Sequence, residues 1–434
     1  MTRSWMIGAA ALALMLPAPT MAATDEEMQQ IKSAIRELEQ RRAEDQARIA
    51  DLERRLKQAE DKTQTVAVPP TAPAPGTARS SNGFNPAIGL TLNGTYGRMT
   101  KDPGAATVPG FALGEEAGIG DRGFSLGESE VNFAANIDHL LYGELTVALS
   151  RENEVEIEEA FIQTTALPWG FTAKAGRFFS GIGYLNDQHA HVWDFVDPPL
   201  PYRAMLGNQY GDDGLQVKWL APTDRFIELG IEGFRGDRFP ATSTNRGNGA
   251  FASYLHVGGD LGLSHSWLAG LSWLHAEAED RATGADLFTG RSNLGIASLV
   301  WKWAPGGNPT QQNLKLQAEY FHRRENGLFN GLDYRGRQSG WYAQAVYQFM
   351  PQWKVGARYD QVSAGDLDPA TFSGSTLDNL GMTSRRWSAL GEYGTSEFGR
   401  FRLQYNRDHA APQVNHELFL NYVVSLGAHG AHKF

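Results

Sequence analysis

The residues with the clearest capacity for chemistry lie close together in one polar segment of the chain. Within eleven residues this segment carries Asp187, His189, His191, Asp194 and Asp197, and Arg203 follows. Imidazole suits zinc, copper or nickel, and carboxylates add the negative charge that favours a divalent cation. His189, His191, Asp187 and Asp194 are therefore candidate ligands for a transient metal ion such as zinc. The spacing is not that of a structural zinc site. The alternative is that these side chains hydrogen-bond the segment to its surroundings, and both roles can coexist.

This segment is also the longest interruption between expected strands, from Ser180 to Asp213. Loops of this length without secondary structure of their own are usually functional. In a pore, such a loop can fold into the lumen, and its charges then decide which solutes pass. We expect the charged residues between Asp187 and Arg203 to form a constriction.

Other patterns that could do chemistry have simpler explanations. A second histidine group lies near the C-terminus, but strand alternation places His429 and His432 on opposite faces, which disfavours a joint metal site. Gly118, Gly120 and Gly123 spell GxGxxG, yet a dinucleotide site needs a strand before this motif and a helix after it. No nucleophile elbow or catalytic triad spacing is evident. The sequence therefore indicates no catalytic residue, no enzyme and no resident cofactor.

From residue 84 onward, apolar and polar residues alternate with a period of two, which is typical of strands. Leu145 and Val147 fall on one face, for example, and Glu144 and Thr146 on the other. Roughly sixteen such strands of about 9–11 residues are expected. They begin near residues 87, 127, 139, 154, 170, 213, 225, 251, 267, 292, 313, 337, 353, 384, 398 and 417. The fold class indicated is an all-β transmembrane barrel with an aqueous lumen. A soluble sandwich or propeller is the alternative.

Composition agrees with a barrel, because 11% of the residues are aromatic, 48 are glycine and none is cysteine. Charges on the polar face of the strands should line the lumen. These are Glu144, Glu228, Glu232, Glu319, Arg323, Arg358 and Arg402. From Thr63 onward the chain holds 38 acidic and 29 basic residues. This excess of negative charge favours passage of cations over phosphate.

The first 83 residues indicate three further parts. Residues 1–23 form a signal peptide, in which Arg3 precedes an apolar run and small residues mark a cleavage site. Residues 24–62 form a periplasmic coiled coil, because apolar residues recur in alternating steps of three and four. Residues 63–83 form a linker rich in Pro, Ala and Ser. Residues 84–434 form the barrel.

The C-terminus adds a signal for membrane assembly. Leu418, Leu420, Tyr422 and Leu426 continue in step with the terminal Phe434, so that this aromatic ring should lie on the lipid face. It resembles the assembly signal of bacterial outer-membrane proteins. We therefore expect an outer-membrane protein of a Gram-negative bacterium that contacts lipid and the barrel assembly machinery.

Longer stretches of the chain resemble a known family. They include GFSLGESEVNFAANIDHLLYGELTVAL, then VEIEEAFIQTTALPWGFTAKAGRFFSGIGYLNDQHAHVWDFVDPPL, and the closing SLGAHGAHKF. These stretches resemble the zinc-regulated outer-membrane porins of Gram-negative bacteria, which are related to phosphate-selective porins. The resemblance implies a sixteen-stranded barrel, a homotrimer, a periplasmic coiled coil and a link to metal uptake. Only the cluster from Asp187 to Asp197 is carried over as a candidate site.

These observations favour a porin-like channel for passive diffusion of small solutes, with a preference for divalent metal cations such as zinc or for small metal complexes. One alternative is a TonB-dependent type of receptor, although such receptors need a plug and about 22 strands. Another is a structural barrel whose stem contacts peptidoglycan or a periplasmic partner. We expect the chain to associate with itself as a trimer, or as a dimer through the coiled coil. We expect no binding to nucleic acid.

Overall fold

The computed structural model describes residues 86–114, 117–149, 155–242 and 248–427. The expected signal peptide, coiled coil and linker lie outside the described residues, and so do Phe434, His429 and His432. No helix among the described residues has both the length and the apolar character needed to cross a membrane.

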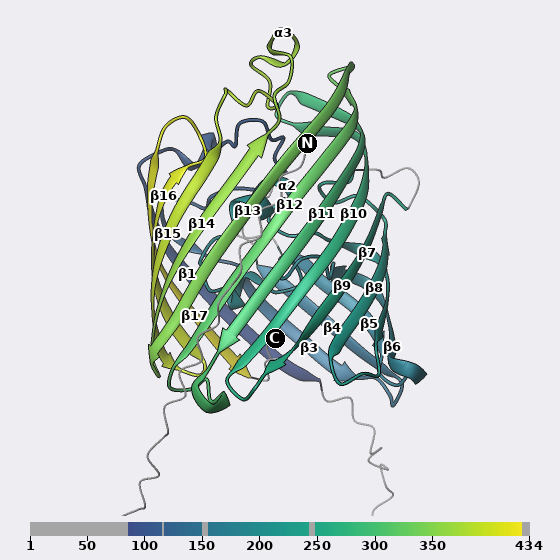
Figure 1. Cartoon of the computed structure of the whole chain (residues 1–434), viewed down its shortest axis with the longest axis vertical. Helices are drawn as coiled ribbons and strands as arrows, with labels where there is room; N and C mark the ends of the chain where they lie inside the picture. The colour runs from purple at the N-terminus through teal and green to yellow at the C-terminus, as the bar shows by residue number, and fades with distance from the viewer. Residues whose placement is uncertain (1–85, 115–116, 150–154, 243–247, 428–434) are drawn as a thin grey trace, which may run out of the picture. The chain divides into compact units, whose positions relative to one another are not determined.

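The described residues form one closed antiparallel sheet (Figure 1). Its strands are β1 (Ala87–Met99), β2 (Gly123–Leu126), β3 (Ser129–Asn136), β4 (Leu141–Leu149), β5 (Val155–Thr164), β6 (Phe171–Phe179), β7 (Gly211–Leu220), β8 (Phe226–Phe234), β9 (Ala250–Leu261), β10 (His265–Thr283), β11 (Asp286–Trp303), β12 (Asn313–Phe329), β13 (Leu332–Met350), β14 (Trp353–Ala364), β15 (Ser384–Ser396), β16 (Gly399–His409) and β17 (Asn415–Gly427). β2 and β3 both pair with β1 and act as one interrupted wall strand. β17 pairs with β1 and closes the ring. The described wall therefore has sixteen strands, which confirms the predicted barrel.

The alternation read from the sequence sets the two faces of the wall. On β12, Leu316 and Tyr320 are exposed on the outside, whereas Gln317, Glu319 and Arg323 are buried on the inside. On β17, Leu418, Leu420, Tyr422 and Leu426 face outward as predicted. A continuous apolar outer face of this kind is what a lipid bilayer requires of a barrel.

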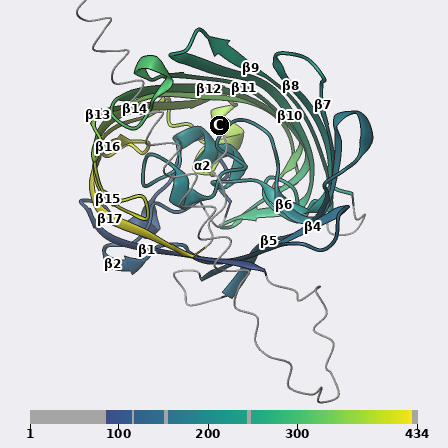
Figure 2. The same ribbon diagram turned by 90° about the horizontal axis from the view of Figure 1, so that it is seen from below.

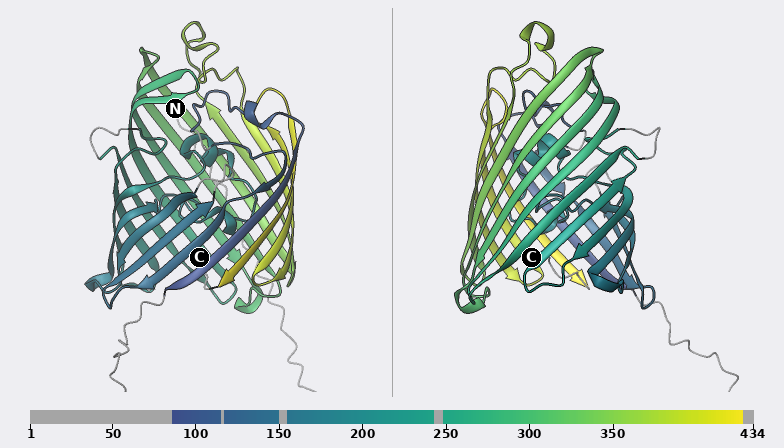
Figure 3. Two further views of the ribbon diagram at one scale, coloured as in Figure 1. Left: turned by 180° about the vertical axis from the view of Figure 1, so that it is seen from behind. Right: turned by 45° about the vertical axis from the view of Figure 1, so that its right-hand side comes forward.

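The wall is uneven in height (Figure 3). β3 to β8 have 8–10 residues each, whereas β10 to β13 have 17–19. β11 and β13 begin several residues before the predicted positions 292 and 337. The reason is visible in β13, where Asp333, Arg335 and Arg337 point outward. Their charges hide the apolar pattern where the strand extends beyond the lipid-facing band.

Short helical turns occupy several connections. They are η1 (Pro103–Ala105), η2 (Pro168–Gly170), η3 (Ala190–Val192), η4 (Pro305–Gly307), α2 (Leu200–Leu206) and α3 (Pro369–Phe372). At one end of the barrel most strands are joined by short turns, such as residues 351–352 between β13 and β14. The connection from β6 to β7 is the longest, and it turns into the barrel.

Candidate functional site

The connection between β6 and β7, residues 180–210, lies inside the barrel and is called the inner loop below. Figure 2 shows its helix α2 within the ring of strands. All seven residues of α2 are buried. Tyr202 packs edge-on against Phe321 of β12, with ring centroids 5.0 Å apart. One apolar cluster contains residues of both the inner loop and the wall. At this level the lumen is filled by the chain itself, which the strand count alone did not predict.

Asp197 fastens the inner loop to one side of the wall. Its carboxylate accepts from Arg358 Nη2 at 2.6 Å and from Arg386 Nη1 at 2.9 Å. It also accepts from the side-chain amides of Gln404 at 2.6 Å and Asn406 at 2.7 Å. Burial disfavours the charged carboxylate, but the two guanidinium groups outweigh it and hold the pKa of Asp197 well below its usual range. The anionic form is therefore fixed in place.

Backbone oxygens of the inner loop are also held by arginines of β14 to β16. Arg402 Nη1 donates to Trp193 O at 2.7 Å, and Arg386 Nη2 donates to Pro198 O at 2.6 Å. Arg358 and Arg402 are 2% and 1% exposed. A buried carbonyl oxygen needs a hydrogen-bond donor, and these arginines supply donors to carbonyl oxygens between Trp193 and Pro198.

Buried carboxylates hold the beginning of the inner loop. Glu232 accepts from Ser180 Oγ and, at 2.9 Å, from Gly181 N. Glu319 accepts from Tyr184 N at 2.8 Å and from Tyr202 Oη at 2.9 Å. These groups point inward, but they are bonded to the inner loop rather than lining open water.

The remaining charges that were expected in the lumen are placed as follows. Glu144 lines an internal cavity and accepts from Asn132 Nδ2 at 2.9 Å. Glu228 pairs with Lys218 Nζ at 3.2 Å. Arg323 is fully buried closer to the end with long loops. Arg203, in α2, is also buried and donates through Nε to Ala117 O at 2.7 Å, so that it joins the inner loop to the β1–β2 connection.

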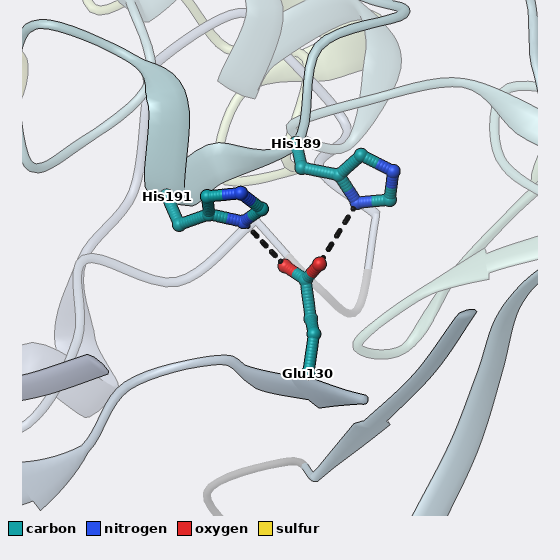
Figure 4. A group of neighbouring side chains, drawn as sticks. All are labelled: Glu130, His189 and His191. Carbon is teal, nitrogen blue, oxygen red and sulfur yellow. Dashed lines mark hydrogen bonds and ion pairs between the residues drawn. The ribbon is translucent and has the colours of Figure 1, made fainter. Parts of the chain in front are cut away.

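His189 and His191 lie together on the other side of the inner loop, facing Glu130 of β3 (Figure 4). His191 Nδ1 is 2.9 Å from Glu130 Oε1, and His189 Nδ1 is 3.3 Å from Glu130 Oε2. The ligand atoms of the three residues all lie within 4.8 Å of one another. Two imidazoles and one carboxylate at this separation form a set that zinc accepts in open sites.

Further carboxylates surround the His189 ring. Nδ1 is 3.0 Å from Glu158 Oε2, and Nε2 is 3.0 Å from Glu159 Oε2. Burial disfavours protonation of His189, but the carboxylates of Glu158 and Glu130 outweigh it and raise the pKa of the imidazole well above its usual value. A metal ion must therefore compete with a proton at this ring.

The candidate metal ligands from the sequence are thus brought together only in part. His189 and His191 converge, whereas Asp194 bonds to Lys315 Nζ at 2.5 Å and accepts from Gln344 Nε2 at 2.8 Å. Asp187 lines the cavity instead. Sequence reasoning missed Glu130, because it lies 61 residues from His191. Its only local signal is the acidic pair Glu128 and Glu130 at the interruption of the wall strand.

A cavity of about 1000 Å³ lies beside this histidine pair. Its lining includes turn residues such as Pro351 and Phe398, so it lies toward the end with short turns. Acidic residues on β3 to β5 line one part, namely Glu130, Glu144 and Glu159. Basic residues on β11 to β16 line another, namely Lys302, Lys315, Lys354 and Arg400. Lys174 and Lys218 also contribute, beyond the acidic strands.

The order of the strands places these two sets on opposite walls. In a closed ring of sixteen, β4 and β12 are eight positions apart, and the same holds for β3 and β11. Glu144 and Glu130 therefore face the side that carries Lys315 and Lys302. Glu392 on β15 also lines the cavity and pairs with Lys354 at 2.9 Å and with Arg400 at 3.2 Å. A solute in this cavity therefore experiences an acidic wall on one side and a wall of mixed charge on the other.

Comparison with known proteins places this geometry in context. No family model matches the chain. A protein of Aquifex aeolicus (strain VF5), described as an uncharacterized protein, is 30% identical over 397 residues, which cover 82% of this chain and 81% of the relative. The chain belongs to the family of this protein. The predicted resemblance to zinc-regulated porins stays a prediction.

Solved structures show the fold of this family. The anion-selective porin from Comamonas acidovorans gives a TM-score of 0.53 at 8% identity, covering 79% of this chain and 99% of that one. The trimer form of OmpT, an outer-membrane protein of Vibrio cholerae, gives 0.52 at 11% identity with the same coverage. The outer-membrane channel DcaP of Acinetobacter baumannii gives 0.51 at 10% identity, covering 79% of this chain and 97% of that one. The family therefore has a porin-like barrel fold.

Proposed function

We propose that this protein is a passive channel for small solutes in the outer membrane of a Gram-negative bacterium, and that the inner loop controls passage. The observation that carries the proposal is the inner loop itself, held inside a closed sixteen-stranded barrel next to a polar cavity of about 1000 Å³. An apolar outer face and a polar, partly occupied lumen are the properties of a membrane barrel that conducts solutes. The likeness to porins supports the same function.

The permeation path follows the acidic wall. On the opposite side, Arg358, Arg386 and Asp197 bind the inner loop through contacts that leave the two guanidiniums 1% exposed. Near β3 and β5 the inner loop is held by His189 and His191, which are 19% and 14% exposed. Glu130, Glu144 and Glu159 line the cavity beside these histidines, and carboxylates on a pore wall attract cations. Cations should therefore pass more readily than anions, in agreement with the net negative charge of the chain.

The finer part of the proposal is a preference for divalent cations. Glu130, His189 and His191 would bind the ion transiently, with Glu158 adding negative charge nearby. Because two ligands belong to the inner loop and one to β3, a bound ion would bridge the inner loop to the wall. Zinc should therefore lower the conductance.

A planar bilayer experiment tests this part. Micromolar zinc is added to the reconstituted channel, and the block is compared between the unmodified protein and a His189→Ala, His191→Ala double variant. The block should disappear in the double variant and persist in His275→Ala, which changes a histidine bonded to Asn293 on the wall. If zinc has no effect on the unmodified channel, the proposed metal preference is wrong. Passive conduction is tested separately by the conductance measured without zinc.

Two alternatives are less well supported. An energised receptor of the TonB-dependent type needs about 22 strands around a plug, whereas the described wall has sixteen. A structural tether depends on residues 24–62, outside the described part. A homotrimer, contacts with the assembly machinery and binding of peptidoglycan also remain predictions.

A further inference from the structure

A second polar cluster lies inside the barrel, away from the inner loop's histidines. It consists of Arg281 on β10, Ser292 on β11, Arg323 and Glu325 on β12, and Gln338 on β13. All five are at most 3% exposed. β11 and β12 pair Ser292 with Glu325 directly, and β12 and β13 pair Arg323 with Gln338. Neighbouring strands therefore bring these side chains to one place on the inner face.

The cluster has fewer acceptors than its donors need. Arg281 donates through Nη2 to Glu325 at 2.8 Å and through Nη1 to Pro240 O at 3.0 Å. Arg323 donates through Nε to Gln338 Oε1 at 2.6 Å. Among the described residues, no acceptor is bonded to Arg281 Nε or to either Nη of Arg323. Glu325 Oε2 also lacks a hydrogen-bond donor there, but this single oxygen cannot accept from all of these N–H groups.

The charges of the cluster are also unbalanced. Within the part of the chain that the structure describes, the two guanidiniums share one carboxylate, and Arg323 Nε is 4.0 Å from Glu325. Phe239 and Phe288 lie against Arg281, at 5.1 and 4.6 Å, and Phe111 lies 5.9 Å from Arg323. Aromatic faces stabilise a cation, but they do not accept the remaining N–H groups. A buried guanidinium with unbonded N–H groups is strongly disfavoured unless an anion or another acceptor meets it.

We propose that the Arg281–Arg323 cluster binds a small inorganic anion, such as chloride or nitrate, at the two Nη atoms of Arg323. The paired N–H groups of a guanidinium form a fork that suits such a ligand. One negative charge would balance the excess positive charge. This site is independent of the proposed metal site and of the channel function.

The anion would also stabilise the end of the barrel with long loops. Gln338 Nε2 donates to Gly110 O at 2.6 Å, and Phe111 covers Arg323, so that the β1–β2 connection rests on this cluster. Arg281 holds Pro240 in the β8–β9 connection. Loss of the anion should therefore loosen both connections.

Bromide provides the direct test, because its anomalous scattering identifies it. Crystals of the full mature chain grown in bromide should show one anomalous peak within hydrogen-bond distance of Arg323 Nη1 and Nη2. In solution, bromide should raise the temperature at which the folded barrel unfolds, relative to gluconate at equal ionic strength. Arg323→Gln should lose this shift. Arg324→Gln, which removes the same charge from an exposed neighbour, should keep it.

The outcomes separate the possibilities without depending on one variant. If Arg323→Gln does not fold, the bromide peak and the comparison with gluconate in the unmodified protein still test whether the cluster binds an anion. Density for water in place of bromide, or equal unfolding temperatures in the two salts, would overturn the proposal. A bromide shift that survives in Arg323→Gln would also overturn it.

Discussion

Replacement of Asp197 by Asn tests the attachment of the inner loop most sharply. The substitution keeps the size of the side chain but removes its charge and one acceptor. Asp197 accepts four side-chain hydrogen bonds, two of them from Arg358 and Arg386. Removal of one partner of a buried ion pair is destabilising by roughly 3–5 kcal/mol. Asp360 also pairs with both arginines, at 3.2 and 2.9 Å, and still balances part of their positive charge in the variant. We therefore expect the lower end, about 3 kcal/mol.

A change of this size should be visible in single-channel recordings. Because about 1.4 kcal/mol corresponds to a tenfold change in an equilibrium, about 3 kcal/mol favours the released inner loop by more than 100-fold. Asp197→Asn should give larger or more frequently fluctuating conductance than the unmodified channel. Asp224→Asn makes the same chemical change in an exposed turn between β7 and β8 and serves as the matched control. Identical conductance, noise and urea stability in Asp197→Asn and the unmodified protein would refute the proposed attachment.

Three further predictions concern the protonation of His189, the block by zinc and the packing at Gly110. His189 has a raised pKa in the folded protein, so its ion pairs stabilise the inner loop fully below the unfolded pKa of about 6.5. This stabilisation is lost as pH rises through the pKa of the folded protein. Conductance should therefore rise at alkaline pH, and His189→Gln should remove that rise. For the same reason, acid should weaken zinc block by keeping the imidazole protonated, and a pH series of block at fixed free zinc would show it; block independent of pH would exclude histidine ligation. Gly110→Ala should destabilise the barrel by roughly 1–3 kcal/mol in urea unfolding, because Gly110 has φ of +83° and a Cβ there would lie 2.4 Å from Ala364 Cβ; an unchanged midpoint would show that the β1–β2 connection is not packed there.

The wall of the barrel was predictable because its signal is local. Alternation gave roughly sixteen strands and the outward face of β17, and the structure shows that these strands close into one antiparallel wall. It failed where the outer face becomes charged, as at Asp333 and Arg335, because the pattern that identifies a strand depends on lipid contact. The interrupted strand of β2 and β3 also became clear only from its pairing with β1.

The interior was less predictable because it depends on closure of the ring. The sequence indicated that the inner loop is unusual, and that His189 and His191 could meet a carboxylate. It could not show that Asp197 bonds to Arg358, 161 residues later. Nor could it show that Glu130 supplies the carboxylate. Such contacts join strands that are distant in the chain, and only their order in the closed barrel determines which side chains face one another.

The proposed function requires that this barrel conducts, with a preference for cations along its acidic wall. The most direct measurement is the reversal potential of the purified protein in a planar bilayer under a salt gradient. We expect discrete conductance steps and a reversal potential whose sign shows a preference for cations. Glu130→Gln and Glu144→Gln together should reduce that preference. Absence of conductance, or a clear preference for anions in the unmodified protein, would contradict the proposed function.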